Sequence, residues 1–271
     1  MIRIGIHGAA GRMGLMIAQA AFNCKEIEIA GGWDIKGHKN SSKDIGLLAG
    51  MEKADILLEE NGDEIIEKSD IIITFSTPYA TIELIKQIKG RRAGLVIGTT
   101  GFTKEQEDIV LEASCYNAIV KTSNFSIGIN LLLSLVKNIS SIYKDDADIE
   151  IVEFHHKHKK DAPSGTAISL GKSIADGLKI DYYENAVFGR SGITSERPSN
   201  QIGIHAVRAG EIVGKHNILF AAKNEEIEII HNAKSRAVFA EGALRACIWL
   251  YGKKPGLYDM KDVLGLNKEE Q

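Results

Sequence analysis

Residues 153–167, EFHHKHKKDAPSGTA, concentrate side chains that are able to do acid–base chemistry. Three of the chain's eight histidines and three lysines occupy six consecutive positions, and a Pro-Ser-Gly-Thr turn follows shortly after. An imidazole changes its charge near neutral pH, and an ammonium group binds anions or gives up a proton. The whole chain carries a net charge of −3, so this positive charge is a local feature. The composition of the stretch predicts a site for a small anion.

The expected elements around the stretch would gather its functional groups. A strand at 148–156 would place Glu153 and His155 on one face and His156 on the other, because side chains alternate along a strand. Lys159 follows in the connection and is free to reach the same cavity. A histidine and a lysine in that position are suited to general acid catalysis.

The Pro-Ser-Gly-Thr turn predicts the start of a helix over 164–178. Ser164 or Thr166 is able to cap this helix, and Gly165 leaves its amide open to a ligand. The amides and the dipole of a helix N-terminus favour anions. With the imidazole and the ammonium group, this helix start predicts recognition of a small polyanion, particularly a dicarboxylate.

Three other interpretations of the basic stretch compete with anion binding. A zinc site would use His156 and His158, but no cysteine or HExxH pattern accompanies them. Nucleic-acid binding does not fit the acidic net charge or the lack of interleaved aromatic residues. A solvated basic loop is the strongest alternative, because lysines usually face water. It remains the interpretation for the residues without an assigned role, which are Lys157, His158 and Lys160.

The turn GAAGRMG at residues 8–14 predicts a phosphate-binding loop. It follows a strand pattern and opens a helix, as the glycine-rich turn of a dinucleotide-binding unit does. Asp34 lies about 20 residues further on, where an acidic residue would bond ribose hydroxyl groups and favour NAD. The basic residues Arg12, Lys36 and His38 lie close enough to tolerate a 2′-phosphate. A tight turn with a solvated Asp34 is the alternative interpretation.

Two further strand ends, GTTGF at 98–102 and TSNFS at 122–126, carry small and amide-bearing residues. Ligands of open α/β sheets bind beyond the carboxyl ends of the strands. The two segments together predict contacts to the nicotinamide ribose, although either one alone would also fit an ordinary turn.

Strand and helix patterns alternate as far as residue 126. Strands are expected at 2–6, 26–34, 69–76, 94–101 and 117–126, and helices at 12–22, 77–90 and 103–114. Thr103 and Gln106 have the spacing of a capping box at the start of the last helix. This alternation predicts a Rossmann-like, doubly wound parallel sheet, which is an α/β fold.

After residue 126 the pattern changes to a helix at 127–143, the strand at 148–156 and the helix at 164–178. Residues 202–222 and 225–233 follow without a helix between them, which indicates antiparallel strands. We therefore expect a doubly wound domain at 1–126, which would bind the dinucleotide, and an α+β domain with a largely antiparallel sheet at 127–235. The helix pattern at 236–252 fits either domain, and its apolar face would suit packing on the first sheet.

The rest of the composition points to a cytoplasmic protein. No apolar stretch reaches the roughly 20 residues of a membrane span, and the N-terminus enters a strand without a signal-peptide pattern. Cys24, Cys115 and Cys247 lie far apart without CxxC spacing. Buried, unreactive thiols and no metal site are expected.

The motifs GAAGRMG, GTTGF, NFSIGIN, HHKHKKDAPSGTA and VRAGEIVGKH together resemble the dihydrodipicolinate reductase family over the whole chain. The resemblance implies reduction of 4-hydroxy-tetrahydrodipicolinate with NADH or NADPH, in lysine and diaminopimelate synthesis. It also implies that 236–271 completes the first domain, and that 127–235 forms a mixed-sheet domain for substrate binding and oligomerisation. A homotetramer, and a hinge that closes over a small dicarboxylate substrate, follow from the same resemblance. Another aspartate-pathway dehydrogenase and a non-enzymatic dinucleotide sensor are the alternatives.

The resemblance also implies residue roles. His155 would be the catalytic proton donor or acceptor and Lys159 the proton donor, and His156, Gly165 and Thr166 would bind substrate carboxylates. The residues that would line the cofactor are Gly8, Ala9, Ala10, Gly11, Arg12, Met13, Asp34, Gly98, Thr99, Thr100, Thr122, Ser123, Asn124 and Phe125. Some members follow the acidic residue with an arginine that meets the NADPH phosphate, whereas this chain has Ile35, so we expect NADH to be preferred or both cofactors to be accepted.

Overall fold

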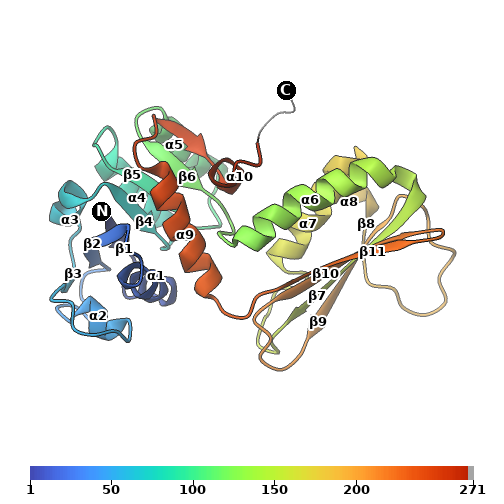
Figure 1. Ribbon diagram of the computed structural model, residues 1–271, viewed down its shortest axis with the longest axis horizontal. Helices are drawn as coiled ribbons and strands as arrows, with labels where there is room; N and C mark the ends of the chain where they lie inside the picture. The colour runs from blue at the N-terminus through green and yellow to red at the C-terminus, as the bar shows by residue number, and fades with distance from the viewer. Residues whose placement is uncertain (268–271) are drawn as a thin grey trace. The chain divides into compact units, whose positions relative to one another are not determined.

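The computed structural model describes residues 1–267, which form two compact units (Figure 1). The first unit comprises Met1–Ile127 and the described residues from Ala237 onward, and the second comprises Gly128–Arg236. Each unit has its own sheet and its own buried apolar cluster. None of the helices among residues 1–267 is long and apolar enough to cross a membrane.

The first unit contains a parallel sheet of seven strands in the order β12-β6-β5-β4-β1-β2-β3. Apolar residues cover both of its faces, which explains the continuous apolar runs of β4 and β5. The Rossmann-like parallel sheet predicted from the sequence is confirmed. The strands are β1 (Ile2–His7), β2 (Ile27–Trp33), β3 (Leu58–Glu59), β4 (Ile71–Thr74), β5 (Gly94–Ile97), β6 (Ala118–Lys121) and β12 (Gly256–Tyr258).

Two groups of helices cover this sheet. On one face pack α1 (Arg12–Phe22) and α9 (Ala237–Leu250), and on the other face pack α3 (Asp63–Lys68), α4 (Pro78–Ile88) and α5 (Lys104–Ser114). The capping box of Thr103 and Gln106 is present at the start of α5. Two short helices, α2 (Ile45–Leu48) and α10 (Met260–Leu264), complete the unit.

The C-terminal segment adds to the first sheet twice. Helix α9 packs against α1 and against β4, β5 and β6, and β12 pairs in parallel with β6 as the edge strand. Gly242 allows α9 to approach closely, since a Cβ there would lie 1.9 Å from the carbonyl oxygen of Phe125. The sequence pattern missed several short elements, among them α3, β12 and α10, which have too few residues to show a period.

The second unit contains a mixed sheet of five strands in the order β11-β10-β7-β9-β8. Apolar residues of α6 (Ile127–Tyr143) and α7 (Gly165–Leu178) pack on one face of it. The remaining elements are β7 (Ala147–His155), the short helix α8 (Tyr182–Asn185), β8 (Ala186–Phe188), β9 (Ile202–Arg208), β10 (Lys215–Ala222) and β11 (Glu226–Asn232).

One sequence-based expectation for this sheet was wrong in part. β10 runs antiparallel to β7 and β11, as expected, but β9 is parallel to both β7 and β8. The reason is that β7 lies between β9 and β10. The chain reverses direction from β9 to β10, so one of the two must be parallel to β7.

Two of the three cysteines differ from the expectation of burial. Cys247 is buried in α9, and burial raises the pKa of its thiol. Cys24 is only half-buried, and Cys115 is exposed because it lies in the turn that ends α5.

Candidate active site

The turn at residues 8–14 needs glycine at two positions. Gly8 has a φ of 78°, in the left-handed region that favours glycine. A Cβ on Gly14 would lie 2.2 Å from the carbonyl oxygen of Gly8, so only glycine fits there. Helix α1 begins after Gly11, and no side chain among residues 1–267 caps it. The first amides of α1 are therefore open to an acceptor, which fits the pyrophosphate of a dinucleotide.

Asp34 follows β2 and is bound to the same turn. Its Oδ2 accepts a hydrogen bond from the amide of Ala10 at 3.0 Å, and its Oδ1 accepts one from the amide of Ile35 at 2.8 Å. Each carboxylate oxygen has a second lone pair for another donor. The carboxylate is thus fixed beside the turn and can still accept ribose hydroxyl groups. Arg12 and Lys36 are both exposed.

His7, at the end of β1, was missed by the sequence analysis. Its Nδ1 lies 2.9 Å from the hydroxyl of Thr74, and its ring stacks on Trp33 with centroids 5.1 Å apart. Burial lowers the pKa of His7 to about 4, although the charge of Asp34 acts in the opposite direction. His7 is therefore neutral at neutral pH. Its position directly before Gly8, at a strand end, is the signal that identifies it.

The segment 98–100 combines buried and exposed residues. Thr99 is 4% exposed, and its hydroxyl lies 2.8 Å from that of Thr81. A Cβ on Gly98 would lie 2.1 Å from the ring of Phe75, so glycine is needed for this packing. Thr100 is exposed. Gly98 and Thr99 shape the strand end, and Thr100 is the residue whose side chain is accessible.

The segment 122–125 forms a turn and then enters the core. The hydroxyl of Thr122 accepts a hydrogen bond from the amide of Asn124 at 3.2 Å. Ser123 is exposed and Asn124 is half-buried. Phe125 is 2% exposed, with its ring 5.5 Å from that of Phe75. A contact of Phe125 with a cofactor would therefore have to come from its main chain.

In the second unit, β7 carries Glu153 and His155 at its carboxyl end. They belong to the buried face of β7, and they are 0% and 9% exposed. The prediction that both lie on one face is confirmed. His156 follows the strand and is half-buried.

Arg208, on β9, forms an ion pair with Glu153. Its guanidinium donates to both carboxylate oxygens of Glu153, each at 2.8 Å. The register of the sheet brings Arg208 next to His155, its partner on β7. Because Glu153 is fully buried, its charge would be costly without this bidentate partner.

Glu153 also determines which nitrogen of His155 is available. Burial disfavours the charge of Glu153, but hydrogen bonds from Arg208, His155 and the amide of Ser164 outweigh burial and lower the pKa of the carboxyl. Oε2 of this carboxylate lies 2.5 Å from Nδ1 of His155. A carboxylate only accepts hydrogen bonds, so Nδ1 carries the hydrogen and Nε2 has a lone pair.

The environment of His155 favours the neutral ring. Burial lowers its pKa, Glu153 raises it, and the positive charges of Lys159 and Arg208 lower it again, with a net shift downward. Gly214 lies beside the ring, and a Cβ there would be 3.1 Å from Nε2. Glycine at position 214 keeps the space next to Nε2 open.

Lys159 lies in the connection after β7. Its Nζ donates to the carboxylate of Asp161 at 2.8 Å, and its side chain is 21% exposed. Lys157 and His158 are exposed and approach Glu211 at 3.8 and 3.6 Å, which agrees with a solvated basic loop.

The start of α7 is fixed by Ser164. Its Oγ accepts a hydrogen bond from the amide of Ala167 at 3.2 Å, and its own amide donates to Oε1 of Glu153 at 3.0 Å. Of the two predicted caps, Ser164 is the one that the helix uses. Gly165 is the first residue of α7 and is exposed, and a Cβ there would meet nothing within 4 Å.

His216, on β10, completes this group and was missed together with Arg208. Its ring centroid lies 5.4 Å from that of His155, and its Nε2 lies 3.2 Å from Oγ of Ser164. Burial, and then the charge that His155 carries when it is protonated, lower the pKa of His216 to about 4. Both missed residues lie in the motif VRAGEIVGKH, but only the pairing of β9 and β10 with β7 shows what they contact.

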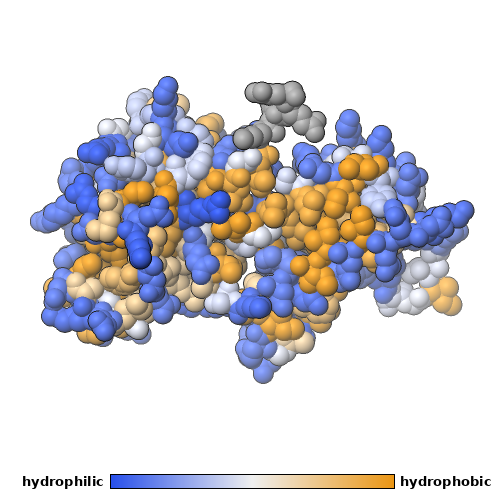
Figure 2. Space-filling view, in the orientation of Figure 1, coloured by the Kyte–Doolittle hydropathy of each residue, from blue (hydrophilic) through white to orange (hydrophobic). Residues whose placement is uncertain are grey.

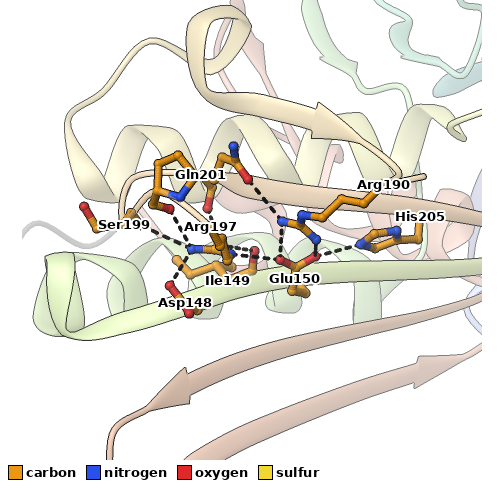
Figure 3. A network of polar contacts seen from close by, with 9 residues as sticks. Asp148, Ile149, Glu150, Arg190, Arg197, Ser199, Gln201 and His205 are labelled. Carbon is orange, nitrogen blue, oxygen red and sulfur yellow. Dashed lines mark hydrogen bonds and ion pairs between the residues drawn. The ribbon is translucent and has the colours of Figure 1, made fainter. Parts of the chain in front are cut away.

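A second charged cluster lies on the opposite face of β7 (Figure 3). Glu150 accepts hydrogen bonds from Arg190 and Arg197, and its Oε2 lies 2.7 Å from Nε2 of His205. Burial would raise the pKa of Glu150, but hydrogen bonds from these three residues lower it to about 2. The cluster ties the connection at 189–201 to the sheet and contains none of the predicted site residues.

The sequence matches two models of one family. Residues 2–125 match the N-terminal part of dihydrodipicolinate reductase, and residues 128–264 match its C-terminal part. A 4-hydroxy-tetrahydrodipicolinate reductase from Hahella chejuensis is 41% identical over 98% of this chain and 100% of its own length. One from Geotalea daltonii is 39% identical with the same coverage.

Solved structures agree with these matches. The dipicolinate-bound dihydrodipicolinate reductase from Paenisporosarcina sp. TG-14 has a TM-score of 0.76 and 25% identity, over 97% of this chain and 99% of its own. A probable dehydrogenase from Thermotoga maritima, at 12% identity and a TM-score of 0.62, over 97% of this chain and 92% of its own, shares the fold alone. The chain therefore belongs to the dihydrodipicolinate reductase family, NAD(P)H-dependent oxidoreductases of lysine and diaminopimelate biosynthesis.

Proposed function

We propose that this chain reduces 4-hydroxy-tetrahydrodipicolinate, through the dehydrated cyclic imine, to tetrahydrodipicolinate, with His155 and Lys159 as its acid–base residues. The observation that carries this proposal is the grouping at the end of β7. An imidazole with an available Nε2, an ammonium group and the start of α7 all lie within residues 155–166. The related reductase from Paenisporosarcina has dipicolinate bound, which supports a dicarboxylate as the ligand of this site.

The start of α7 would hold one substrate carboxylate. Gly165 has room for a ligand atom against its main chain, because nothing lies within 4 Å of its Cβ position. The amides of a first helical turn favour a negative group by charge and by direction. Thr166 would share this contact, and His156 would bind the same carboxylate or the second one. A substrate that is fixed in this way is already oriented for the reaction, so the step becomes effectively unimolecular.

Lys159 would donate the proton that completes the reduction. A reduced nicotinamide, when bound, supplies a hydride, and the electron-rich ring then needs a proton. Lys159 carries an ammonium group on an accessible side chain. This group would leave Asp161 and bind the substrate instead. His155 is held neutral, so Nε2 would accept a proton or a hydrogen bond.

The turn at residues 8–13 and Asp34 would hold the cofactor in the first unit. The open amides of α1 suit the pyrophosphate, and Asp34 suits the adenine ribose. Thr100, Ser123 and Asn124 would reach the nicotinamide ribose with their side chains. Asp34 repels a 2′-phosphate and Ile35 offers no charge to bind one, so we propose that NADH is preferred or that both cofactors are accepted.

We also propose that the protein forms a homotetramer in the cytoplasm. The face of the second sheet that α6 and α7 do not cover has half-exposed apolar side chains, among them Val152, Phe154 and Leu219. Exposed apolar residues also gather on α6, at Leu131, Leu135 and Ile142 (Figure 2). Burying such surfaces between subunits is favourable. The three free cysteines suit a reducing compartment.

The direct test is substrate-dependent oxidation of NADH and of NADPH. Rates would be compared with the enzymatically generated cyclic imine and with aspartate semialdehyde. The proposal expects turnover with the imine only. Turnover with aspartate semialdehyde would favour another aspartate-pathway dehydrogenase, and nicotinamide binding without turnover would favour a dinucleotide sensor.

A further inference from the structure

We propose that Glu153 is a positioning residue that sets the imidazole of His155 and the start of α7 relative to one another. The inference rests on the proposed function, in which these two groups act on one substrate. Glu153 does so with its two carboxylate oxygens. Oε2 binds Nδ1 of His155 at 2.5 Å, and Oε1 binds the amide of Ser164 at 3.0 Å. Because one rigid carboxylate makes both contacts, the acid–base group and the helix start share one anchor.

Arg208 fixes the carboxylate itself. It donates to both oxygens of Glu153 at 2.8 Å, which leaves the carboxylate plane little freedom to rotate. The same guanidinium donates to the carbonyl oxygen of Asp161 at 2.7 Å. Asp161 pairs with Lys159, so the connection that carries the proposed proton donor is attached to the same ion pair. Glu153 and Arg208 thereby organise the whole stretch from β7 to α7.

Glu153 differs in charge from the other residues that surround His155. Four residues act on the imidazole: Glu153 on β7, Lys159 in the following connection, Arg208 on β9 and His216 on β10. Of these four, only Glu153 is negative. Its removal would leave His155 among positive neighbours and would release the hydrogen at Nδ1 from its acceptor. The ring would then be free to turn Nε2 away from the space beside Gly214.

The substitution Glu153→Gln tests this role while preserving shape. We expect kcat to fall about tenfold or more, the scale of a mispositioned acid–base group. We expect KM to rise as well, because Ser164 loses a charged acceptor. Removing the negative charge lowers the pKa of His155, so the acid limb of the kcat profile, where the neutral ring is lost, should move about one pH unit lower.

Glu150→Gln is the matched control. Glu150 lies on the same strand and also binds arginines, but on the opposite face. Its substitution should leave the pH profile of kcat in place. An equal shift in both variants would overturn the proposal, because the effect would then belong to any glutamate of β7 that binds arginines.

The double variant Glu153→Gln/Arg208→Gln separates positioning from folding. It removes the unpaired charge that the single variant leaves on Arg208, so its thermal stability should recover toward that of the wild type. The proposal expects the kcat defect to persist in this folded double variant. The acid limb of its kcat profile should stay below that of the wild type, but by less than in the single variant, because Arg208 also lowers the pKa of His155. Full recovery of both would mean that Glu153 serves only as the partner of Arg208.

A titration of the His155 ring by NMR in the full chain, without substrate, keeps this test distinct from that of the proposed function. The proposal expects a lower pKa for His155 in Glu153→Gln than in the wild type, whatever substrate the protein reduces. If the wild type does not reduce the imine, the proposed function fails while this shift still reports on Glu153. An unchanged His155 pKa in the folded variant would overturn the inference.

Discussion

The turn at residues 8–14 and the site at the end of β7 both suit anions, but the first offers main-chain amides, whereas the second adds charged side chains to the amides at the start of α7. At the turn, glycines give access to the amides of α1, and the carboxylate of Asp34 is bound to it. At the end of β7, a buried glutamate and an arginine hold a histidine. The contrast predicts that the turn is sensitive to added atoms and that the second site is sensitive to lost charges.

The largest effect is expected when the ion pair in the second unit is broken from the arginine side. Arg208→Ala leaves Glu153 buried without its main partner, which should lower the free energy of unfolding by about 3–5 kcal/mol. Chemical denaturation of the variant measures this. Arg190→Ala is the control, because Glu150 keeps Arg197 and His205. If both variants lose the same stability, the buried pair has no special role.

An added methyl group should distinguish the two sites next. Gly14→Ala places a Cβ 2.2 Å from the carbonyl oxygen of Gly8, and it should cost about 3 kcal/mol of stability together with most of the affinity for NADH. Gly165→Ala meets nothing within 4 Å, so its stability should stay within about 0.5 kcal/mol of the wild type or rise. Thermal unfolding and a nucleotide-binding titration measure both effects. Equal losses in the two variants would contradict the contrast.

Each site also contains a histidine, half-buried His7 or buried His216, that should weaken the fold in acid. The pKa values of His7 and His216 are lowered from 6.5 to about 4. A histidine with a lowered pKa contributes stability that is complete above the unfolded value and is lost as the pH falls through 6.5 toward 4. Between pH 7 and pH 5, each should cost about 2 kcal/mol.

Unfolding curves of His7→Gln and His216→Gln at several pH values test this. Each variant should lose less stability on acidification than the wild type does, and the exposed His158→Gln should behave like the wild type. An unchanged acid sensitivity in either of the first two variants would mean that its histidine is not the titrating group.

The smallest effect concerns cofactor choice at the turn. Ile35→Arg places a positive charge after Asp34, where it could bind a 2′-phosphate. One charge-assisted hydrogen bond corresponds to about a tenfold gain in kcat/KM for NADPH over NADH. The ratio of the two rates measures it, with Ile35→Gln as the uncharged control. A ratio that does not change would place the 2′-phosphate away from residue 35.

The same contrast explains what the sequence predicted. The turn at 8–14 and Asp34 could be identified because glycine spacing is local and follows from a strand–turn–helix pattern. His155 and Lys159 were predicted in the same way, within one basic stretch. Arg208 and His216 were not, since they meet Glu153 and His155 only through the pairing of β9 and β10 with β7. The parallel direction of β9 was missed for the same reason, because strand order is not a local property.

The kcat of His155→Ala and Lys159→Ala on the enzymatically generated substrate tests the central claim most directly. With saturating substrate and cofactor, each variant should be slower than the wild type by roughly a hundredfold, the scale of general acid–base catalysis. The folded state of each variant would be checked by its thermal unfolding. Full turnover in either folded variant would contradict the account and would remove that residue from the chemistry.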